Sequence, residues 1–255
     1  MEKAQGSDQE EVHIMSDTKP AQPSDPKLSL ERSGIRRLVQ VFASVLLIGA
    51  LLFLSAGRLN WPEAWFFSCL YLAYLLALMG WGLGRDPDLM NERGKRADNV
   101  KGWDKVLMAI YVPILFIMPV IAGLDAGRFG WSVMPLAWQV IGLVGLIPAM
   151  AMPWWAISVN TYLSTVVRIQ DDRDHQVVTT GPYQYVRHPT YVGTILFGLC
   201  TPLLLGSWWA LIPGGLIAIL FVIRTALEDR TLRDELPGYA DYAQRVRYRL
   251  LPGVW

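Results

Sequence analysis

The sequence predicts an all-α integral membrane protein with about six transmembrane helices, the last two a tight hairpin, followed by a cytoplasmic C-terminal helix. Three observations support this fold class. Of the 255 residues, 53% are hydrophobic and 18% are charged, whereas soluble domains carry about 25% charged residues. The apolar residues gather in six long runs, and basic residues concentrate in alternate connections between those runs.

We expect residues 1–30 to form a disordered tail on the cytoplasmic side. Glu, Asp, Ser, Gln, Lys and Pro dominate this segment, which cannot bury enough apolar surface to offset the entropy cost of ordering. No apolar core follows a basic start, so the segment does not have the pattern of a signal peptide.

Four apolar runs follow and form the predicted N-terminal helical region, residues 31–157. They cover Leu38–Ala56, Trp61–Leu83, Val106–Leu124 and Val133–Ile157. A helix rises about 1.5 Å per residue, so runs of this length match a hydrocarbon core of about 30 Å. Prolines within the third and fourth runs are tolerated in membrane helices, because neighbouring groups satisfy the freed carbonyls.

The last two runs, Tyr191–Leu205 and Trp208–Ile223, belong to a predicted C-terminal core, residues 158–255. Only Gly206-Ser207 joins them, so we expect a tight helical hairpin. The fifth run is short for a full crossing of the bilayer.

The distribution of basic residues predicts the orientation. Arginines and lysines are concentrated before the first run, between the second and third, between the fourth and fifth, and after the sixth. The other connections hold only Arg58, only Arg128, or no basic residue. By the positive-inside rule, both termini therefore face the cytoplasm. Arginine outnumbers lysine and alanine and glycine are frequent, from which we interpret the membrane as a bacterial inner membrane.

Composition also excludes several classes of function. The net charge is +1 and no basic stripe carries interleaved aromatic residues, so nucleic-acid binding is not indicated. The two cysteines, Cys69 and Cys200, each lie in an apolar run and are expected to be buried small side chains. No Cys/His cluster with metal-ligand spacing is present, so no metal site is predicted.

Two polar blocks, Asn160–Tyr191 and Arg224–Trp255, fall on the predicted cytoplasmic side and flank the hairpin, so they can meet in space. The first contains GPYQYVRHPTYVG. This stretch places Arg187 and His188 at a helix N-terminus, with Pro189 in the first turn. Free amides and the helix dipole favour an anionic group there, from the chain or from a ligand.

The second block continues the sixth helix through about Leu236, breaks at Pro237-Gly238 and resumes as a short amphipathic helix. Arg224 and Glu228 are four residues apart at the membrane boundary, so we expect them to pair or to face a polar cavity. Asp229–Arg233 has the same spacing and is interpreted as a solvated surface pair. Tyr239 and Tyr242 are three apart and are interpreted as a membrane-surface anchor; a wall around a cationic ligand is the alternative.

Taken together, these residues resemble the isoprenylcysteine carboxyl methyltransferase and phospholipid methyltransferase superfamily. The resemblance rests on GPYQYVRHPTYVG, then an acidic pair with ED–x–x–L, then PGY–x–x–Y and a late proline, and covers about residues 160–252. It implies a membrane-embedded enzyme that uses S-adenosylmethionine (SAM). No strand–GxGxxG–helix element is present, so a soluble Rossmann-type SAM enzyme is not expected.

The resemblance also implies the site residues. Glu228 would handle the amino-acid end of the cofactor, Arg224 would lie beside an acceptor carboxylate, and Asp229 replaces the second glutamate of the family pattern. The implied catalytic residues are Arg187, Arg224 and Glu228. The implied cofactor-binding residues are Tyr183, His188, Pro189, Tyr191, Glu228, Asp229, Tyr239 and Tyr242.

The expected acceptor is a lipid or lipid-like molecule that arrives from the bilayer. Prenylated cysteine, a phospholipid amine, another lipid carboxylate and a small thiol all remain open. A carboxylate acceptor is ionised at neutral pH and needs no general base, whereas an amine or thiol would need one, with His188 as candidate. Two other functions are considered: a sterol-reductase-like enzyme that uses NADPH, and a non-catalytic membrane scaffold or small transporter.

Overall fold

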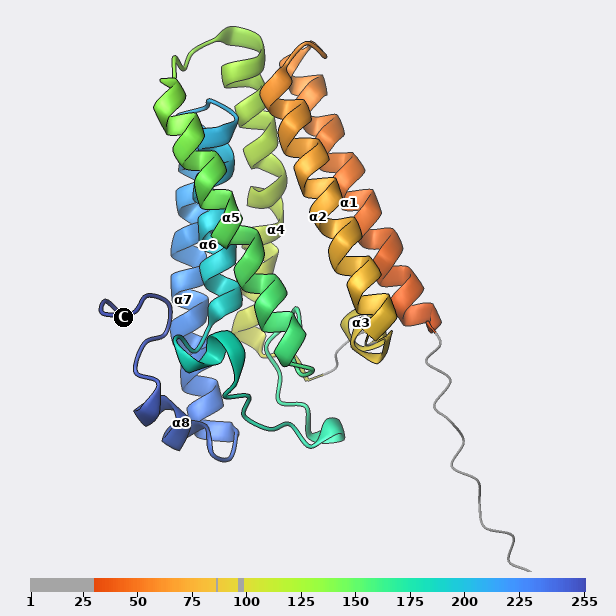
Figure 1. Cartoon of the computed structure of the whole chain (residues 1–255), viewed down its shortest axis with the longest axis vertical. Helices are drawn as coiled ribbons and strands as arrows, with labels where there is room; N and C mark the ends of the chain where they lie inside the picture. Colours follow the sequence, from red (N-terminus) through yellow and green to blue (C-terminus); the bar gives the residue numbers. More distant parts are fainter. Residues whose placement is uncertain (1–29, 86, 96–98) are drawn as a thin grey trace, which may run out of the picture.

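The computed structural model describes residues 30–85, 87–95 and 99–255, which form a bundle of helices without a β-strand (Figure 1). The predicted N-terminal tail lies outside the described residues, apart from Leu30. The α-helices are α1 (Arg32–Ala56), α2 (Pro62–Arg85), α3 (Pro87–Gly94), α4 (Gly102–Ala122), α5 (Leu136–Val159), α6 (Pro189–Leu204), α7 (Leu211–Glu235) and α8 (Tyr239–Arg245). The shorter turns are a π-helical turn η1 (Gly123–Phe129) and two 3₁₀ turns, η2 (Asp171–Arg173) and η3 (Gly181–Gln184).

Five helical segments in the described part of the chain are long and apolar enough to cross a membrane: α1, α2, α4 with η1, α5 and α7. In the most apolar window of each, only 11% to 33% of the residues are buried inside the protein. Apolar side chains therefore cover the outside of the bundle, as a surface facing lipid requires. The described part of the chain is therefore all-helical and has the surface of an integral membrane protein. α6 is apolar but has only 16 residues, which confirms that the fifth run is short.

Each predicted apolar run corresponds to one helix, with two differences. α1 begins at Arg32 rather than at Leu38, because two polar turns extend the helix before the apolar run starts. α3 was predicted only as part of a connection. Its eight residues are mostly polar and show no apolar periodicity, so no pattern in the sequence indicates a helix there.

α6 and α7 form the predicted hairpin and turn through residues 205–210. A Cβ atom at Gly214 would overlap the carbonyl oxygen of Gly198, so the two backbones touch at this point. A Cβ atom at Gly142 of α5 would likewise lie 2.6 Å from the backbone nitrogen of Leu204. Small residues therefore let α5, α6 and α7 pack side by side, as Figure 1 shows.

At the end of the bundle away from α8, the carboxylate of Asp125 fixes the hairpin turn. It is fully buried and accepts hydrogen bonds from the hydroxyls of Ser207 and Ser132, both at 2.6 Å. The backbone N–H of Ser132 also donates to it, at 2.7 Å. These bonds satisfy the buried charge and connect η1 to the turn between α6 and α7.

The C-terminal block folds as predicted along the chain. α7 ends at Glu235 and α8 starts at Tyr239, after a break at which Gly238 has a φ of +80°. Beyond α8 the chain returns to the start of α6. The carbonyl of Tyr248 accepts the N–H of Arg187 and the carbonyl of Arg249 accepts that of His188, both at 3.0 Å. The two polar blocks therefore meet at the lower end of the bundle in Figure 1.

The two cysteines have different environments. Cys200 is buried, as predicted, but Cys69 is exposed on α2, so the prediction is wrong for Cys69. α2 is apolar on all sides, and a uniformly apolar helix does not reveal from its sequence which face points outward.

Candidate functional site

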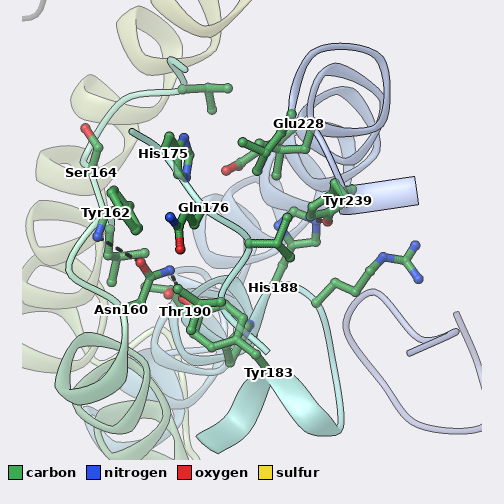
Figure 2. Close-up of a pocket in the computed structure, with 18 of the residues that line it drawn as sticks. Asn160, Tyr162, Ser164, His175, Gln176, Tyr183, His188, Thr190, Glu228 and Tyr239 are labelled. Atoms are coloured by element: carbon green, nitrogen blue, oxygen red, sulfur yellow. Dashed lines mark hydrogen bonds between the residues drawn. The ribbon is translucent and has the colours of Figure 1, made fainter. Parts of the chain in front are cut away.

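A pocket opens where the segment between α5 and α6, the first turn of α6, the end of α7 and α8 come together (Figure 2). The cavity volume is about 110 Å³, well below the roughly 300–1,000 Å³ of typical small-molecule sites. A ligand of nucleotide size therefore requires the wall of the pocket to move outward.

His188 caps the N-terminus of α6, with Pro189 as the first helical residue, as predicted. The side chain of Arg187 points to Asp229 on α7 in a bidentate pair, with Nε–Oδ1 at 2.6 Å and Nη2–Oδ2 at 3.0 Å. Its Nη1 donates to the carbonyls of Val246 and Arg247 at 2.6 and 2.8 Å. The predicted anionic partner near this helix end is thus a carboxylate of the chain itself. Arg187 is a buried, fully engaged link between α6, α7 and the C-terminal segment.

Asp229 is the centre of this network. Its carboxylate also accepts bonds from the Tyr239 hydroxyl at 3.1 Å and from Arg249 Nε at 3.0 Å. Arg233 lies 3.1 Å away, yet Asp229 itself has no exposed surface. The prediction of a solvated Asp229–Arg233 pair is therefore wrong, because helical spacing identifies the partner but not the side of the helix that is buried. Asp229 is not among the residues that line the pocket.

Glu228, the neighbour of Asp229, has a different environment. It is half-buried, lines the pocket, and accepts a hydrogen bond from the Tyr191 hydroxyl. None of the ion pairs among the described residues involves Glu228. Its carboxylate is therefore available to a cationic group of a ligand, and Figure 2 shows it pointing into the pocket.

Arg224 does not pair with Glu228. Of the two alternatives predicted for these residues, a mutual pair or a polar cavity, Glu228 meets the second, because it lines the pocket. Arg224 pairs instead with Asp104 in the first turn of α4, with Nε–Oδ1 at 2.8 Å and Nη2–Oδ2 at 3.2 Å. Nη2 also donates to the carbonyl of Thr165 at 3.0 Å. The guanidinium lies 5.1 Å from the centre of the Tyr191 ring. Arg224 thus sits behind a pocket residue and is not itself one of the lining residues.

Sequence reasoning missed Asp104. It is fully buried, and it accepts a bond from the backbone N–H of Val167 at 2.8 Å in addition to its pair with Arg224. It therefore ties α4 to the wall of the pocket, which includes Val167. A single acid in the first turn of an apolar helix looks like an ordinary helix start, and its partner is 120 residues away.

The tyrosines form much of the pocket wall. The Tyr191 ring stacks on the His188 ring, with centroids 5.6 Å apart. Asn160 Nδ2 donates to the Tyr183 hydroxyl at 2.9 Å, and burial raises the pKa of Tyr183 to about 12. Tyr239 and Tyr242 are 4% and 2% exposed. The predicted surface anchor is therefore wrong: both rings point inward, and both line the pocket.

His175 is a further lining residue that the sequence reasoning did not single out. Its Nδ1 atom is buried and has no hydrogen-bond partner among the described residues. Burial, followed by the positive charges of Arg168 and Arg173, lowers the pKa of His175. The ring lies 4.8 Å from that of Tyr162. An unsatisfied buried nitrogen facing a pocket is available to a ligand. The polar block that contains His175 was predicted, but no residue pattern marked this position.

Residues 140–234 match the sequence model of the isoprenylcysteine carboxyl methyltransferase (ICMT) family. Two curated relatives are both named protein-S-isoprenylcysteine O-methyltransferase. The chain is 47% identical to the Schizosaccharomyces pombe protein over 45 residues, which is 18% of this chain and 19% of that protein. It is 35% identical to the Saccharomyces cerevisiae protein over 93 residues, 36% of each chain. The chain therefore covers only about a fifth and a third of these relatives.

A solved structure of the eukaryotic intramembrane Ras methyltransferase ICMT aligns with 83% of this chain and 84% of its own, at 18% identity and a TM-score of 0.42. At that level the alignment supports no argument about this chain. The matched region includes the start of α6, the hairpin and Glu228. The start of α6 and Glu228 are parts of the pocket wall. Residues 140–234 are thus similar to the isoprenylcysteine carboxyl methyltransferase family.

Proposed function

We propose that the protein is a SAM-dependent methyltransferase that acts on a lipophilic acceptor delivered by the membrane. The observation that carries this proposal is Glu228, a half-buried carboxylate in a pocket walled by tyrosines, for which the described residues supply no cationic partner. This pocket lies within the region that matches the ICMT family, and both curated relatives are named as methyltransferases.

The chemistry of the pocket fits SAM. The cofactor carries a sulfonium and an ammonium, both cationic, together with a carboxylate and an adenosine. Glu228 would hold the ammonium, and the rings of Tyr183, Tyr191 and Tyr239 would face the sulfonium or the adenosine. His175 Nδ1, buried without a partner among the described residues, would bond a polar atom of the adenosine. SAM, when bound, supplies an activated methyl group.

The arginines have different parts in this proposal. Nε and Nη2 of Arg187 donate to the carboxylate of Asp229, and Nη1 donates to two backbone carbonyls. We therefore assign Arg187 a positioning role, in which it fixes the start of α6 and His188. Nη1 of Arg224 forms no hydrogen bond with the described residues. It would reach a carboxylate of the acceptor or the cofactor once the Tyr191 ring in front of it moves aside. Holding the acceptor in line with the methyl group in this way lowers the activation barrier of a displacement reaction by several kcal/mol.

The pocket lies at the end of the bundle that contains the basic connections, where the sequence predicts both termini. By the positive-inside rule, we propose that the active site and the C-terminal helix α8 face the cytoplasm. A bacterial inner membrane remains our interpretation of the composition. We count α6 as a sixth, tilted or partial span. The acceptor would enter from the bilayer beside the pocket. Arg224 favours an acceptor with a carboxylate, which needs no general base; for an amine or thiol acceptor, His188 in the pocket would have to accept the proton.

Two other functions are less well supported. A sterol-reductase-like enzyme would bind NADPH at this pocket, and a scaffold would need no unpaired Glu228. The family match favours the methyltransferase over both. Purified protein should bind labelled SAM and not NADPH, and membranes containing it should transfer the methyl label to a lipid or lipid-linked fraction. Binding of NADPH with no binding of SAM would overturn the proposal, as would the absence of labelled product in every membrane fraction.

A further inference from the structure

The C-terminal segment, residues 246–255, lies against the two residues that precede α6. Four successive carbonyls of this segment, those of residues 246–249, accept hydrogen bonds from Arg187 and His188. The last of them, the carbonyl of Arg249, accepts the N–H of His188 at 3.0 Å. His188 lines the pocket, whereas Arg249 does not. The place of His188 in the pocket is therefore set in part by a residue outside the pocket.

The side chain of Arg249 ties this segment to α7. Its Nε donates to Asp229 Oδ2 at 3.0 Å, which is the one ion pair between the C-terminal segment and α7 among the described residues. Its guanidinium lies 4.7 Å from the centre of the Trp255 ring. The carbonyl of Trp255 in turn accepts the backbone N–H groups of Arg249 and Leu250, at 2.9 and 3.1 Å. Because Arg249 is held through both its side chain and its backbone, a shift of the side chain would also move the carbonyl that holds His188.

A second path from Arg249 to His188 runs through the carboxylate of Asp229. Arg249 contacts Oδ2, whereas Oδ1 lies 3.6 Å from His188 Nε2 and accepts a hydrogen bond from the Tyr239 hydroxyl at 3.1 Å. The same hydroxyl lies 3.4 Å from His188 Nε2. Members of such a buried polar network depend on one another. Rotation of the carboxylate would therefore change the polar contacts of the His188 imidazole.

Arg233 provides an internal comparison. Its Nε lies 3.1 Å from the same oxygen of Asp229, and its side chain is 43% exposed, against 29% for Arg249. Both arginines thus give Oδ2 a partly exposed cationic partner. Arg233 lies on α7 itself, one helical turn from Asp229, so this pair connects no second segment to α7. Of the two arginines, Arg249 alone carries a backbone group that holds His188.

We propose that Arg249 is a positioning residue of the candidate active site, which fixes His188 in the pocket while it contacts neither the cofactor nor the acceptor. The inference rests on the proposed function, because His188 can contact the cofactor only if the pocket binds SAM. Methyl transfer requires the acceptor, the methyl carbon and the sulfur to be in line, and a misplacement of about 1 Å can lower the rate by about 100-fold. Loss of the Arg249 side chain would therefore disturb the pocket from outside it.

The first measurement does not involve SAM. The chain has three histidines, so the ring signals of His188 can be followed by NMR of histidine-labelled protein and assigned by their absence in H188Q. The full-length protein in detergent micelles is compared with R249Q, R249K and R233Q. We expect R249Q to shift the His188 signals and R233Q to leave them close to those of the parent. R249K keeps a cation near Asp229 and should shift them less than R249Q.

The second measurement is equilibrium binding of labelled SAM to the same proteins. R249Q should bind one SAM per folded protein at least about fivefold more weakly than the parent. R249K should recover part of this loss, and R233Q should bind SAM like the parent. A merely structural role of Arg249 would lower the number of binding sites or the stability, and the dissociation constant of the folded protein would stay the same.

Unmoved His188 signals in folded R249Q would overturn the inference. Equal shifts in R249Q and R233Q would do so too, as would a shift in R249Q with an unchanged dissociation constant for SAM. If the parent binds no SAM while R249Q shifts the His188 signals, the proposed function fails and the link from Arg249 to His188 stands. If R249Q does not fold, as judged by circular dichroism and gel filtration, W255A removes the ring beside the guanidinium and should shift the His188 signals. Unmoved signals in W255A would then overturn the inference.

Discussion

Replacement of Asp229 by Asn tests whether the buried network around Arg187 holds the site together. The substitution keeps the size of the side chain and removes one negative charge. In the folded protein that charge faces Arg187 in a pair whose two side chains are each 1% exposed. Arg249, with a side chain 29% exposed, depends on the same carboxylate.

The expected magnitude follows from this burial. Breaking a buried pair by removing one partner costs about 3–5 kcal/mol, because the other charge is left uncompensated. An exposed pair contributes about 0–1 kcal/mol. The pair of Lys101, just before α4, with Glu235, on the same helix as Asp229, is such a pair, with side chains 30% and 43% exposed. We therefore expect D229N to lower the free energy of unfolding by about 3–5 kcal/mol and E235Q by less than about 1 kcal/mol.

The assay is unfolding in detergent micelles, followed by circular dichroism, for the parent, D229N and E235Q under one set of conditions. A loss in D229N no larger than the loss in E235Q would refute the reasoning. It would mean that Arg187 is compensated by the carbonyls of Val246 and Arg247 alone, and that Asp229 is not the centre of the network.

Two further predictions concern the hairpin and the pocket. G214A should lower the free energy of unfolding by about 1–3 kcal/mol, because the added Cβ would overlap the backbone of Gly198. G215A, whose added Cβ would meet no atom of another helix within 4 Å, should be neutral or stabilising in the same unfolding assay. Equal effects of the two substitutions would contradict the close packing of α6 and α7. The lowered pKa of His175 means that the unfolded chain binds a proton more readily, so this contribution to stability is present above about pH 6.5 and is lost as the pH falls through the folded-state pKa. H175Q should therefore show a smaller drop in Tm between pH 7.5 and pH 5.5 than the parent; an unchanged drop would contradict this assignment.

Much of the fold can be predicted from the sequence because the bilayer imposes long apolar segments. Each apolar run became a helix, and the break at Pro237-Gly238 and the short α6 were also predicted. α3 could not be predicted, since a short polar helix that packs on α1 through Gly94 leaves no periodic signal. The exposure of Cys69 could not be predicted either, because α2 is apolar on every face.

The location of the candidate site was predicted, but the ion-pair partners of its charged residues were not. The two polar blocks meet, and Glu228 lines the pocket. Partners that are distant along the chain could not be identified from the sequence. Arg224 pairs with Asp104 rather than with Glu228, and Asp229 is buried rather than solvated. Helical spacing reveals which residues share a face, but not which distant helix covers that face.

The central claim is that Glu228 holds the cationic end of SAM, and equilibrium binding of labelled SAM to purified protein tests it most directly. A charge-assisted hydrogen bond contributes about 1.5–3 kcal/mol to the free energy of binding, so E228Q should bind SAM at least about tenfold more weakly than the parent. E235Q, which removes an exposed carboxylate from the same helix, should bind SAM like the parent. Equal dissociation constants for E228Q and the parent, in protein shown to be folded, would contradict the account.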